Sequence, residues 1–526
     1  MRMFRRIAVL LLTGTGAVLC LPHAFGQEAP LVEDPTALAA AATTRAAAGS
    51  TALTANWTRD NPQLVSAAMV GLPPVPAGPF QNSWDSIKAN YKDPDWFRDG
   101  KFGIMMHLGI FSVPAHGSEW YVRYMYGGNA GIMQWHTQNF GPPTTFGYKD
   151  FLPMYTCAKF DPDAWAALFK KAGAKYVLAP GEHHDGFSNW DSAINPYNAK
   201  NYGPHRDIDG DLIKALEKAG LKTGISDHSF FHFQFIPALP GSDEYDPKWA
   251  AFYCVADRSN AARIKFMHDW VAKRIETIDK YHPDMLWFDM NTDHATDALK
   301  ILVSDYYFNR ARQWGKDVAI SAKTQAWVEG QVMDYERQGR APKQLTDYVW
   351  EPDDPITDKF GYVVGVPVKP APGIIRLIYT NVARNGNYLL NISPMADGTI
   401  PDAQQQVLLA IGKWMDVNGE AIYSTRPWKM SEEGHVFFAT KGDSLYAITS
   451  DWPTELAIPA LATSKVTDGK IEKVEMLGHA GPLDFTQDAA GLHVKFPAQK
   501  PCDVAYALKI TGLKLPAAKA ASQPSK

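Results

Sequence analysis

The chain has 526 residues, of which 46% are hydrophobic, and its formal net charge at pH 7 is −4. This length exceeds what a single domain is expected to hold, and the apolar fraction is ample for a large core. A charge so close to neutral gives no indication of binding to nucleic acid or to an anionic membrane surface.

The first 26 residues are predicted to be a signal peptide. Three arginines among the first six residues precede an apolar run over 7–21, and the small residues within 24–26 suit cleavage. The apolar run is short for a membrane span. Cys20 raises the alternative of a lipid anchor, but Leu19 before it is bulky for that processing. We therefore expect export to the periplasm or beyond, without stable membrane insertion.

Residues 27–80 are rich first in Ala and Thr and then in Gly and Pro, which predicts a linker or loosely attached leader. The last residues, 515–526, are predicted to be disordered. After the signal peptide the chain keeps three cysteines, Cys157, Cys254 and Cys502. They lie far apart in the sequence and lack metal-ligand spacing, so disulfides are not expected to hold this fold.

Residues 81–428 alternate short apolar runs with amphipathic stretches, which predicts a parallel α/β fold. The predicted strands cover 102–110, 175–179, 221–226, 285–288 and 318–321. The predicted helices cover 162–173, 210–220 and 260–281, and the first two of them end in Gly. No Gly-rich phosphate-binding motif follows the first strand, which favours a (β/α)8-like barrel over an open sheet.

Residues 429–514 show a different pattern, with short strands and no long amphipathic stretch. The runs 435–440 and 444–449 flank Lys441-Gly442-Asp443, which predicts a hairpin. Further strands are predicted at 471–476, 492–496 and 504–511. We expect a small antiparallel β-sandwich domain.

Polar and aromatic side chains follow the predicted strands of the barrel, where catalytic groups gather in such folds. In chain order these candidates are His107, Glu119, Trp120, His183, His184, His228 and Asp289. An imidazole both donates and accepts hydrogen bonds, so this set suits a polyol pocket. Adjacent histidines on a strand point to opposite faces, and zinc sites usually show other spacings, so no metal is expected.

Six motifs in this order resemble the α-L-fucosidases of glycoside hydrolase family 29, from about Trp84 to Trp428. The motifs are KFGIMMHLG, SVPAHGSEWY, GEHHDGFSNWDS, DMLWFD, RNGNYLLNISPMADGTIP and NGEAIYSTRPW. The resemblance implies a (β/α)8-like catalytic barrel followed by a β-sandwich. It also implies retaining hydrolysis of fucosylated oligosaccharides or glycoconjugates by double displacement, with no cofactor.

In this family the Asp of the WFD-type motif is the nucleophile, which implies that role for Asp289. The acid/base residue lies in a variable region, where Glu336 and Glu351 are the candidates. Glu336 is favoured because its DYERQG segment resembles one found in many relatives, and Glu351 is the runner-up. The resemblance implies sugar contacts for His107, Glu119, Trp120, His183, His184 and Trp287.

The chain departs from the family pattern at several positions. Many relatives carry Asn-Asp-Arg where this chain has Ala322-Lys323-Thr324, so Lys323 stands where an Arg is usual. A lysine supplies a point charge instead of a planar fork. Leu108 and His116 replace two tryptophans of the usual motifs. These changes concern the details of sugar recognition.

Three other functions are compatible with the sequence. The enzyme could act on an L-galactose-like sugar, which has the same ring stereochemistry as fucose. It could also be a catalytically silent carbohydrate-binding protein, which the presence of Asp289 and two candidate acids argues against. A metallohydrolase is the third alternative, and insensitivity to a chelator would exclude it. Linkage preference, the natural glycan and the oligomeric state leave no signal in the sequence.

Overall fold

The computed structural model describes residues 61–466 and 468–515. The predicted signal peptide with Cys20, residues 27–60 of the predicted leader and residues 516–526 of the predicted tail lie outside these residues. Within the described ranges, no helix is both long enough and apolar enough to cross a membrane. Cys157, Cys254 and Cys502 are all described, and each is a free thiol.

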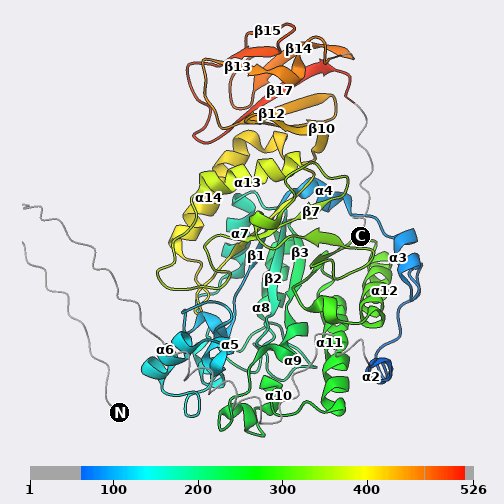
Figure 1. Ribbon diagram of the computed structural model, residues 1–526, viewed down its shortest axis with the longest axis vertical. Coiled ribbons are helices and arrows are strands. Elements are labelled where there is room, and N and C mark those ends of the chain that lie inside the picture. Colours follow the sequence, from blue (N-terminus) through cyan, green and yellow to red (C-terminus); the bar gives the residue numbers. More distant parts are fainter. Residues whose placement is uncertain (1–60, 467, 516–526) are drawn as a thin grey trace, which may run out of the picture. The chain divides into compact units, whose positions relative to one another are not determined.

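Nine parallel strands form one sheet in the order β7-β6-β5-β4-β3-β2-β1-β9-β8. Only Pro352 separates β7, which pairs with β6, from β8, which pairs with β9, so these two short strands continue one another and the sheet closes on itself as a barrel. Figure 1 shows β1, β2 and β3 of this sheet side by side. The predicted (β/α)8-like barrel is therefore confirmed. The strand bounds are β1 Phe102–Met106, β2 Tyr176–Glu182, β3 Lys222–Asp227, β4 Met285–Phe288, β5 Ala319–Lys323, β6 Val332–Asp334, β7 Trp350–Glu351, β8 Asp353–Pro355 and β9 Tyr388–Ile392.

The strand sequences are those of a parallel sheet that is covered on both faces. Every residue of β1 and of β4 is buried, so neither strand alternates between apolar and polar positions. Gly103 in β1 lies against the ring of Tyr176, where a Cβ would come within 2.2 Å of a ring carbon. The barrel interior is therefore packed with side chains at this level.

Helices cover the outside of most of the barrel, and three of them match the predicted helices. Asp161, Asp207 and Ser259 cap the N-termini of α7, α8 and α11 by accepting a backbone N–H bond. Residues 324–349, all of them described, contain no α-helix, so the sheet is less regular between β5 and β7. The helix bounds are α5 Tyr121–Arg123, α6 Ala130–Phe140, α7 Pro162–Lys171, α8 Ile208–Lys218, α9 His232–Phe235, α10 Ala250–Tyr253, α11 Asn260–Tyr281, α12 Asp297–Trp314, α13 Ala371–Ala383 and α14 Asp402–Asn418.

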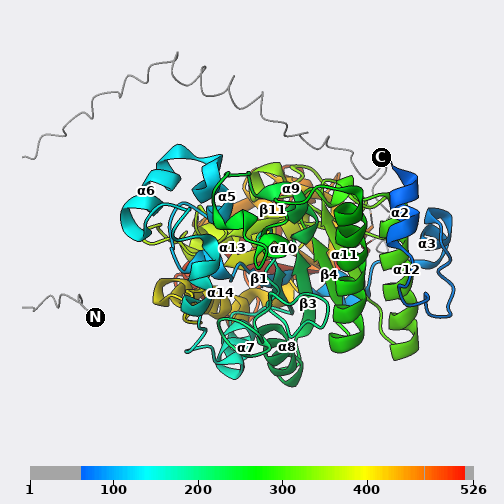
Figure 2. The same cartoon turned by 90° about the horizontal axis from the view of Figure 1, so that it is seen from below.

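The stretch 61–80 differs from the expected loose leader. It contains the helix α2 (Pro62–Ala68), which packs beside α11, and it is followed by α3 (Trp84–Asn90) beside α12 and by α4 (Asp95–Gly100) (Figure 2). Phe80 is buried, and its backbone N–H donates to Asn309 Oδ1 at 3.1 Å. The prediction rested on the Gly- and Pro-rich composition and overlooked the apolar residues that pack this segment against the barrel.

The C-terminal part forms two antiparallel sheets around a shared apolar core, which confirms the predicted β-sandwich. The predicted hairpin is β11–β12, with Gly442 at a positive φ of 55° in its turn. The predicted boundary at 428/429 falls inside β10. The sheets consist of β10 Arg426–Glu433, β11 Val436–Lys441, β12 Ser444–Thr449, β17 Tyr506–Leu513 and β14 Gly469–Met476, and of β13 Glu455–Ile458, β16 Leu492–Lys495 and β15 Phe485–Gln487.

Candidate active site

A cavity of about 240 Å³ lies at the carboxyl ends of the barrel strands. Because all strands run parallel, the residues that follow them meet at this one end of the barrel. Nine of the residues singled out from the sequence line the cavity, namely His107, Glu119, Trp120, His183, His184, His228, Asp289, Lys323 and Glu336.

Asp289 follows β4, and its carboxylate is buried among positive and polar groups. Lys323 Nζ lies 2.7 Å from Oδ1, and His184 Nε2 lies 3.1 Å from Oδ2. Burial by itself would raise the pKa of Asp289, but the Lys323 ammonium and the nearby imidazoles outweigh it, so the pKa lies well below its usual range. Asp289 is therefore ionised near neutral pH.

Lys323 ends β5 and lies between two carboxylates. Its Nζ is 2.7 Å from Asp289 and 3.0 Å from Asp353 Oδ2. Burial alone would lower the pKa of Lys323, yet the two carboxylates raise it above its ordinary value. Burial, together with neighbouring Asp334, raises the pKa of Asp353 well above normal. Because a raised pKa favours the neutral form of Asp353, the ammonium of Lys323 forms its ion pair chiefly with Asp289.

Three histidines converge in the cavity, and we call His107, His183 and His228 the imidazole cluster. Their ring centroids lie 4.7 to 5.3 Å apart. Burial lowers the pKa of all three, so the rings are neutral near pH 7. Asn391 donates to Phe360 O, so its Oδ1, 2.7 Å from His107 Nδ1, is the acceptor for that ring.

Free ring nitrogens remain in the imidazole cluster. His107 Nε2 is left as an acceptor, because Nδ1 carries the proton that is donated to Asn391. Within the described residues, His183 Nδ1 and both nitrogens of His228 are buried without a hydrogen-bond partner. Buried polar atoms of this kind need a partner, and the hydroxyl groups of a bound sugar would supply it.

The imidazole cluster is also the set of described residues that comes nearest to a metal site. One nitrogen from each ring lies within 4.8 Å of the other two. Tetrahedral zinc with bonds of about 2.1 Å needs ligand atoms about 3.4 Å apart, so the rings would have to approach one another. The Lys323 ammonium is also close enough to lower the pKa of His107 and His228. A sugar hydroxyl fits this spacing and charge better than a cation.

The expectation that His183 and His184 point to opposite faces is wrong. β2 ends at Glu182, and the chain then turns through Gly186, whose N–H donates to His183 O at 3.1 Å. Strand alternation therefore no longer applies, and both rings face the cavity with centroids 4.5 Å apart. His184 Nδ1 lies 2.7 Å from His228 O, so its ring is fixed between that carbonyl and Asp289.

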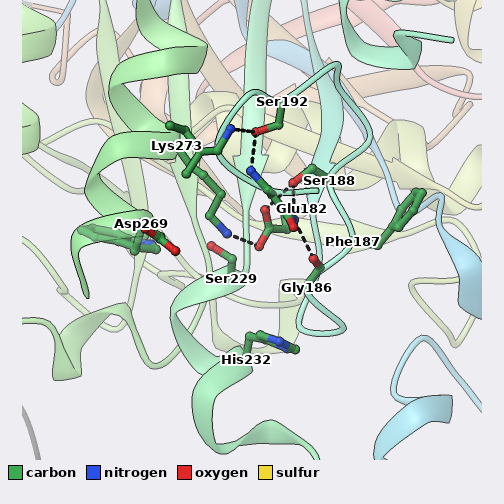
Figure 3. Close-up of polar contacts among 12 residues, drawn as sticks. Glu182, Gly186, Phe187, Ser188, Ser192, Ser229, His232, Asp269 and Lys273 are labelled. Carbon is green, nitrogen blue, oxygen red and sulfur yellow. Dashed lines mark hydrogen bonds and ion pairs between the residues drawn. The ribbon is translucent and has the colours of Figure 1, made fainter. Parts of the chain in front are cut away.

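Two buried acids behind the histidines tie the strand ends to α11. Glu182 and Asp227 are the last residues of β2 and β3, and their side chains point outward while the next histidine points inward. Glu182 forms an ion pair with Lys273 and accepts from Ser188 Oγ at 2.7 Å (Figure 3). Asp227 pairs with Arg274 in the same way. These pairs hold the histidine-bearing ends of β2 and β3 in position.

A further contact supports the turn after β2 from below. His232 Nδ1 lies 2.8 Å from the carbonyl oxygen of His184, and Figure 3 shows this ring beneath the Glu182–Lys273 pair. Because a carbonyl oxygen only accepts, His232 Nδ1 donates. The backbone on both sides of His183 is thus fixed from outside the cavity.

The two candidate acid/base residues lie in different surroundings. Glu336 lines the cavity two residues after β6, with a side chain 16% exposed and Arg340 Nη1 3.1 Å away. Glu351 lies in the barrel interior, where Tyr176 Oη donates to it at 2.6 Å and Ser321 Oγ at 2.8 Å. Burial raises the pKa of Glu351 to about 7. Glu351 does not reach the cavity.

Trp287 also lies beneath the cavity instead of lining it. Its Nε1 donates to Asp334 Oδ2 at 2.8 Å, and its ring packs 5.1 Å from His228.

Six residues that line the cavity were not predicted from the sequence, and these are Ser118, Tyr124, Met290, Arg337, Lys359 and Phe360. Lys359 and Phe360 follow β8, which is hard to recognise from the sequence because the segment WEPDDP of β7 and β8 contains two prolines and three acids. Recognising that strand would have pointed to them.

The chain and its fold are similar to known proteins. A family model described as Alpha-L-fucosidase matches residues 73–420, and one described as Alpha-L-fucosidase C-terminal domain matches 430–511. Tissue alpha-L-fucosidase of Homo sapiens is 33% identical over 466 residues, which cover 83% of this chain and 92% of the human protein. Alpha-L-fucosidase of Branchiostoma floridae is 30% identical over 468 residues, covering 82% and 96%. The crystal structure of Thermotoga maritima alpha-fucosidase in complex with fucose matches with a TM-score of 0.67 and 27% identity, covering 82% of this chain and 100% of that one.

Proposed function

Since this chain belongs to the α-L-fucosidases of glycoside hydrolase family 29, we propose that it is an exo-acting, retaining enzyme that releases terminal L-fucose from fucosylated glycans. The observation that carries the proposal is the ionised Asp289 at the floor of a small cavity. A volume of about 240 Å³ has room for one sugar ring and little more, which supports action at chain ends. No cofactor is needed for this chemistry.

The reaction takes two displacements at carbon-1 of the sugar. In the first, an oxygen of Asp289 attacks carbon-1, the bond to the leaving oxygen breaks, and Glu336 gives that oxygen a proton. In the second, Glu336 takes a proton from water, the water oxygen attacks carbon-1, and the ester bond to Asp289 breaks. Two inversions restore the α configuration, and both carboxyl groups return to their starting states.

Glu336 is the proposed acid/base residue because it reaches the cavity. Its partly exposed position supports exchange of a proton with water between the two steps. Glu351 is fully buried and hydrogen-bonded within the barrel, which argues for a structural role instead of a catalytic one. A carboxyl with a pKa near 7 would otherwise suit general acid catalysis, so location decides between the two.

The remaining cavity residues are proposed to bind the sugar. The imidazole cluster offers acceptors and donors for hydroxyl groups, and Glu119, also in the wall, offers a carboxylate. Trp120 is partly buried at the rim, 5.7 Å from the His184 ring, and presents an indole to the cavity. Trp287 acts from below by packing against His228.

Hydrolysis of 4-nitrophenyl α-L-fucoside, followed by proton NMR, tests the proposal directly. We expect α-L-fucose as the first product, with the β anomer rising later by mutarotation. Release of β-fucose first would contradict retention. The 4-nitrophenyl L-galactoside, which differs at carbon-6, tests the alternative substrate, and binding of fucose without turnover of either compound would indicate a carbohydrate-binding protein.

Export is proposed from the N-terminal sequence, which lies outside the described residues. Relatives include tissue and plasma fucosidases, and fucosylated glycans are the family's substrates. N-terminal sequencing of the mature protein is expected to start near Gln27. A lipid-bearing start at Cys20 would mean a membrane anchor, and an intact Met1 in the cytoplasm would contradict export.

A further inference from the structure

Two cations line the catalytic cavity without a carboxylate to neutralise them. Arg337 and Lys359 both belong to the wall, and both side chains are partly buried. Among the described residues, neither lies within 4.0 Å of an Asp or Glu oxygen, although every other charged side chain in this wall has a partner of some kind. Partly buried charge without a counter-charge is costly, which points to a ligand that supplies one.

The other charged side chains of the cavity wall already have partners within the protein. Lys323 lies between Asp289 and Asp353, and Glu336 pairs with Arg340. Glu119 accepts the backbone N–H of Gly361 at 3.1 Å. The wall around Arg337 and Lys359 therefore carries positive charge that no neighbouring carboxylate balances.

Arg337 is held in place before any ligand arrives. Its backbone has a φ of 61°, a conformation that disfavours ordinary side chains, and its N–H donates to Asp353 O at 2.9 Å. The guanidinium lies 4.8 Å from the centre of the Phe360 ring, and Nη2 donates to Asp358 O at 3.3 Å. Backbone strain maintained in this way is typical of functional positions. The fixed planar fork suits an oxyanion.

The two cations lie on the side of the cavity where the leaving group must sit. Arg337 is the residue next to Glu336, which donates its proton to the leaving oxygen in the proposed mechanism. Lys359 is next to Phe360, the ring that Arg337 covers. The fucose ring itself is expected on the opposite side, against the imidazole cluster and Asp289.

We propose that Arg337 and Lys359 form a subsite for an anionic group, a sulfate ester or a carboxylate, carried by the sugar from which fucose is released. This inference rests on the proposed function and narrows its substrates to acidic glycans. Charge-assisted hydrogen bonds to both cations would favour such a leaving group over a neutral one of the same shape.

Three fucosyl disaccharides that differ at one carbon test the subsite. Fucose is α-linked to galactose, to galactose 6-sulfate or to galacturonic acid, in the linkage that the enzyme cleaves fastest, and kcat/KM is measured from released fucose. At low ionic strength we expect kcat/KM to be about tenfold higher for an anionic substrate than for the neutral one. Preference for the sulfate, for the carboxylate or for both would identify the group, and 300 mM NaCl should reduce the preference.

Variants distinguish binding at this subsite from an effect of the overall charge of the protein. In Lys359→Gln and in Arg337→Gln/Lys359→Gln the ratio of anionic to neutral kcat/KM should fall toward one, and loss of activity common to both substrates cancels in that ratio. Lys343→Gln removes the same charge from an exposed lysine outside the cavity and should leave the ratio unchanged. A wild-type ratio of one or less, or a preference that persists in the double variant, would overturn the proposal. No hydrolysis of any α-L-fucoside would instead overturn the proposed function.

Discussion

Replacing Lys323 with methionine removes the cation that keeps Asp289 ionised. Both side chains are almost fully buried, at 6% and 4% exposure, and Nζ lies 2.7 Å from Oδ1. Breaking a buried ion pair by removing one partner costs about 3–5 kcal/mol, because the remaining charge is left in a poor solvent. The His184 contact at 3.1 Å remains, and Asp353 can be neutral because its pKa is already raised. We therefore expect Lys323→Met to lose about 3 kcal/mol of unfolding free energy at pH 7, at the low end of that range.

The same change should alter the pH dependence of catalysis. In the wild type the pKa of Asp289 is depressed, so the stability that its ionised form contributes is present above the unfolded pKa of about 3.9 and is lost as pH falls through the folded value. Without Lys323 the folded pKa rises, and each 1.4 kcal/mol corresponds to about one pKa unit. The acid limb of kcat/KM is thus expected to move upward by about two units.

Urea unfolding at pH 7 and pH–kcat/KM profiles on an activated aryl fucoside measure the two effects. Lys323→Arg serves as the matched control, because it keeps the charge and is the residue usual in many relatives. It should retain most of the stability and the wild-type acid limb. If Lys323→Met unfolds within 1 kcal/mol of the wild type and its acid limb does not move, the ion pair does not control Asp289.

Asp289→Gly is expected to lower turnover by several orders of magnitude while the protein stays folded by circular dichroism, and added azide should yield β-fucosyl azide; near-normal turnover would exclude Asp289 as nucleophile. Glu336→Ala should lose far more activity on a natural fucosyl oligosaccharide than on an aryl fucoside, because a good leaving group needs little protonation. If Glu351→Ala shows that pattern instead, the two residues exchange roles. EDTA should leave kcat/KM unchanged, and metal analysis of the purified protein should find no stoichiometric zinc; zinc held by two or more rings of the imidazole cluster would refute their assignment to sugar hydroxyls.

Much of the barrel could be predicted because its first four strands are easily recognised in the sequence. Their apolar runs are short, separated by capped helices, and followed at once by histidine or carboxylate residues, as in the segment that ends at Asp289. Parallel topology then brings those residues together without further information. The six motifs shared with the α-L-fucosidases allowed two further predictions, the order of the elements and the identity of the nucleophile.

The part after β5 could not be predicted in the same way. β6 has three residues and β7 has two, and the strand that closes the barrel is broken at Pro352 and carries buried acids. Neither an alternating pattern nor an apolar run therefore reveals these strands in the sequence. Without the strands, the sequence spacing could not decide which of Glu336 and Glu351 reaches the cavity. The turn at His183-His184 was missed for a related reason, because the point where a strand ends decides which way adjacent side chains face.

Because residues 324–349 contain no α-helix, we expect two parts of the barrel to differ in local stability. β1 to β4 are backed by long helices and carry the histidines and Asp289, whereas β6 and β7 contribute few ladder hydrogen bonds and lie near Glu336 and Arg337. Amide hydrogens in such short strands exchange with solvent through small local openings, and those of buried, helix-backed strands exchange only through larger ones. We therefore expect slower amide exchange in the strands of the half that holds the fucosyl group than in β6 and β7, although the Arg337 side chain stays held by Asp358 and Phe360. Substitutions could then accumulate around the leaving group and change which glycans are cleaved, while the chemistry at carbon-1 stays the same.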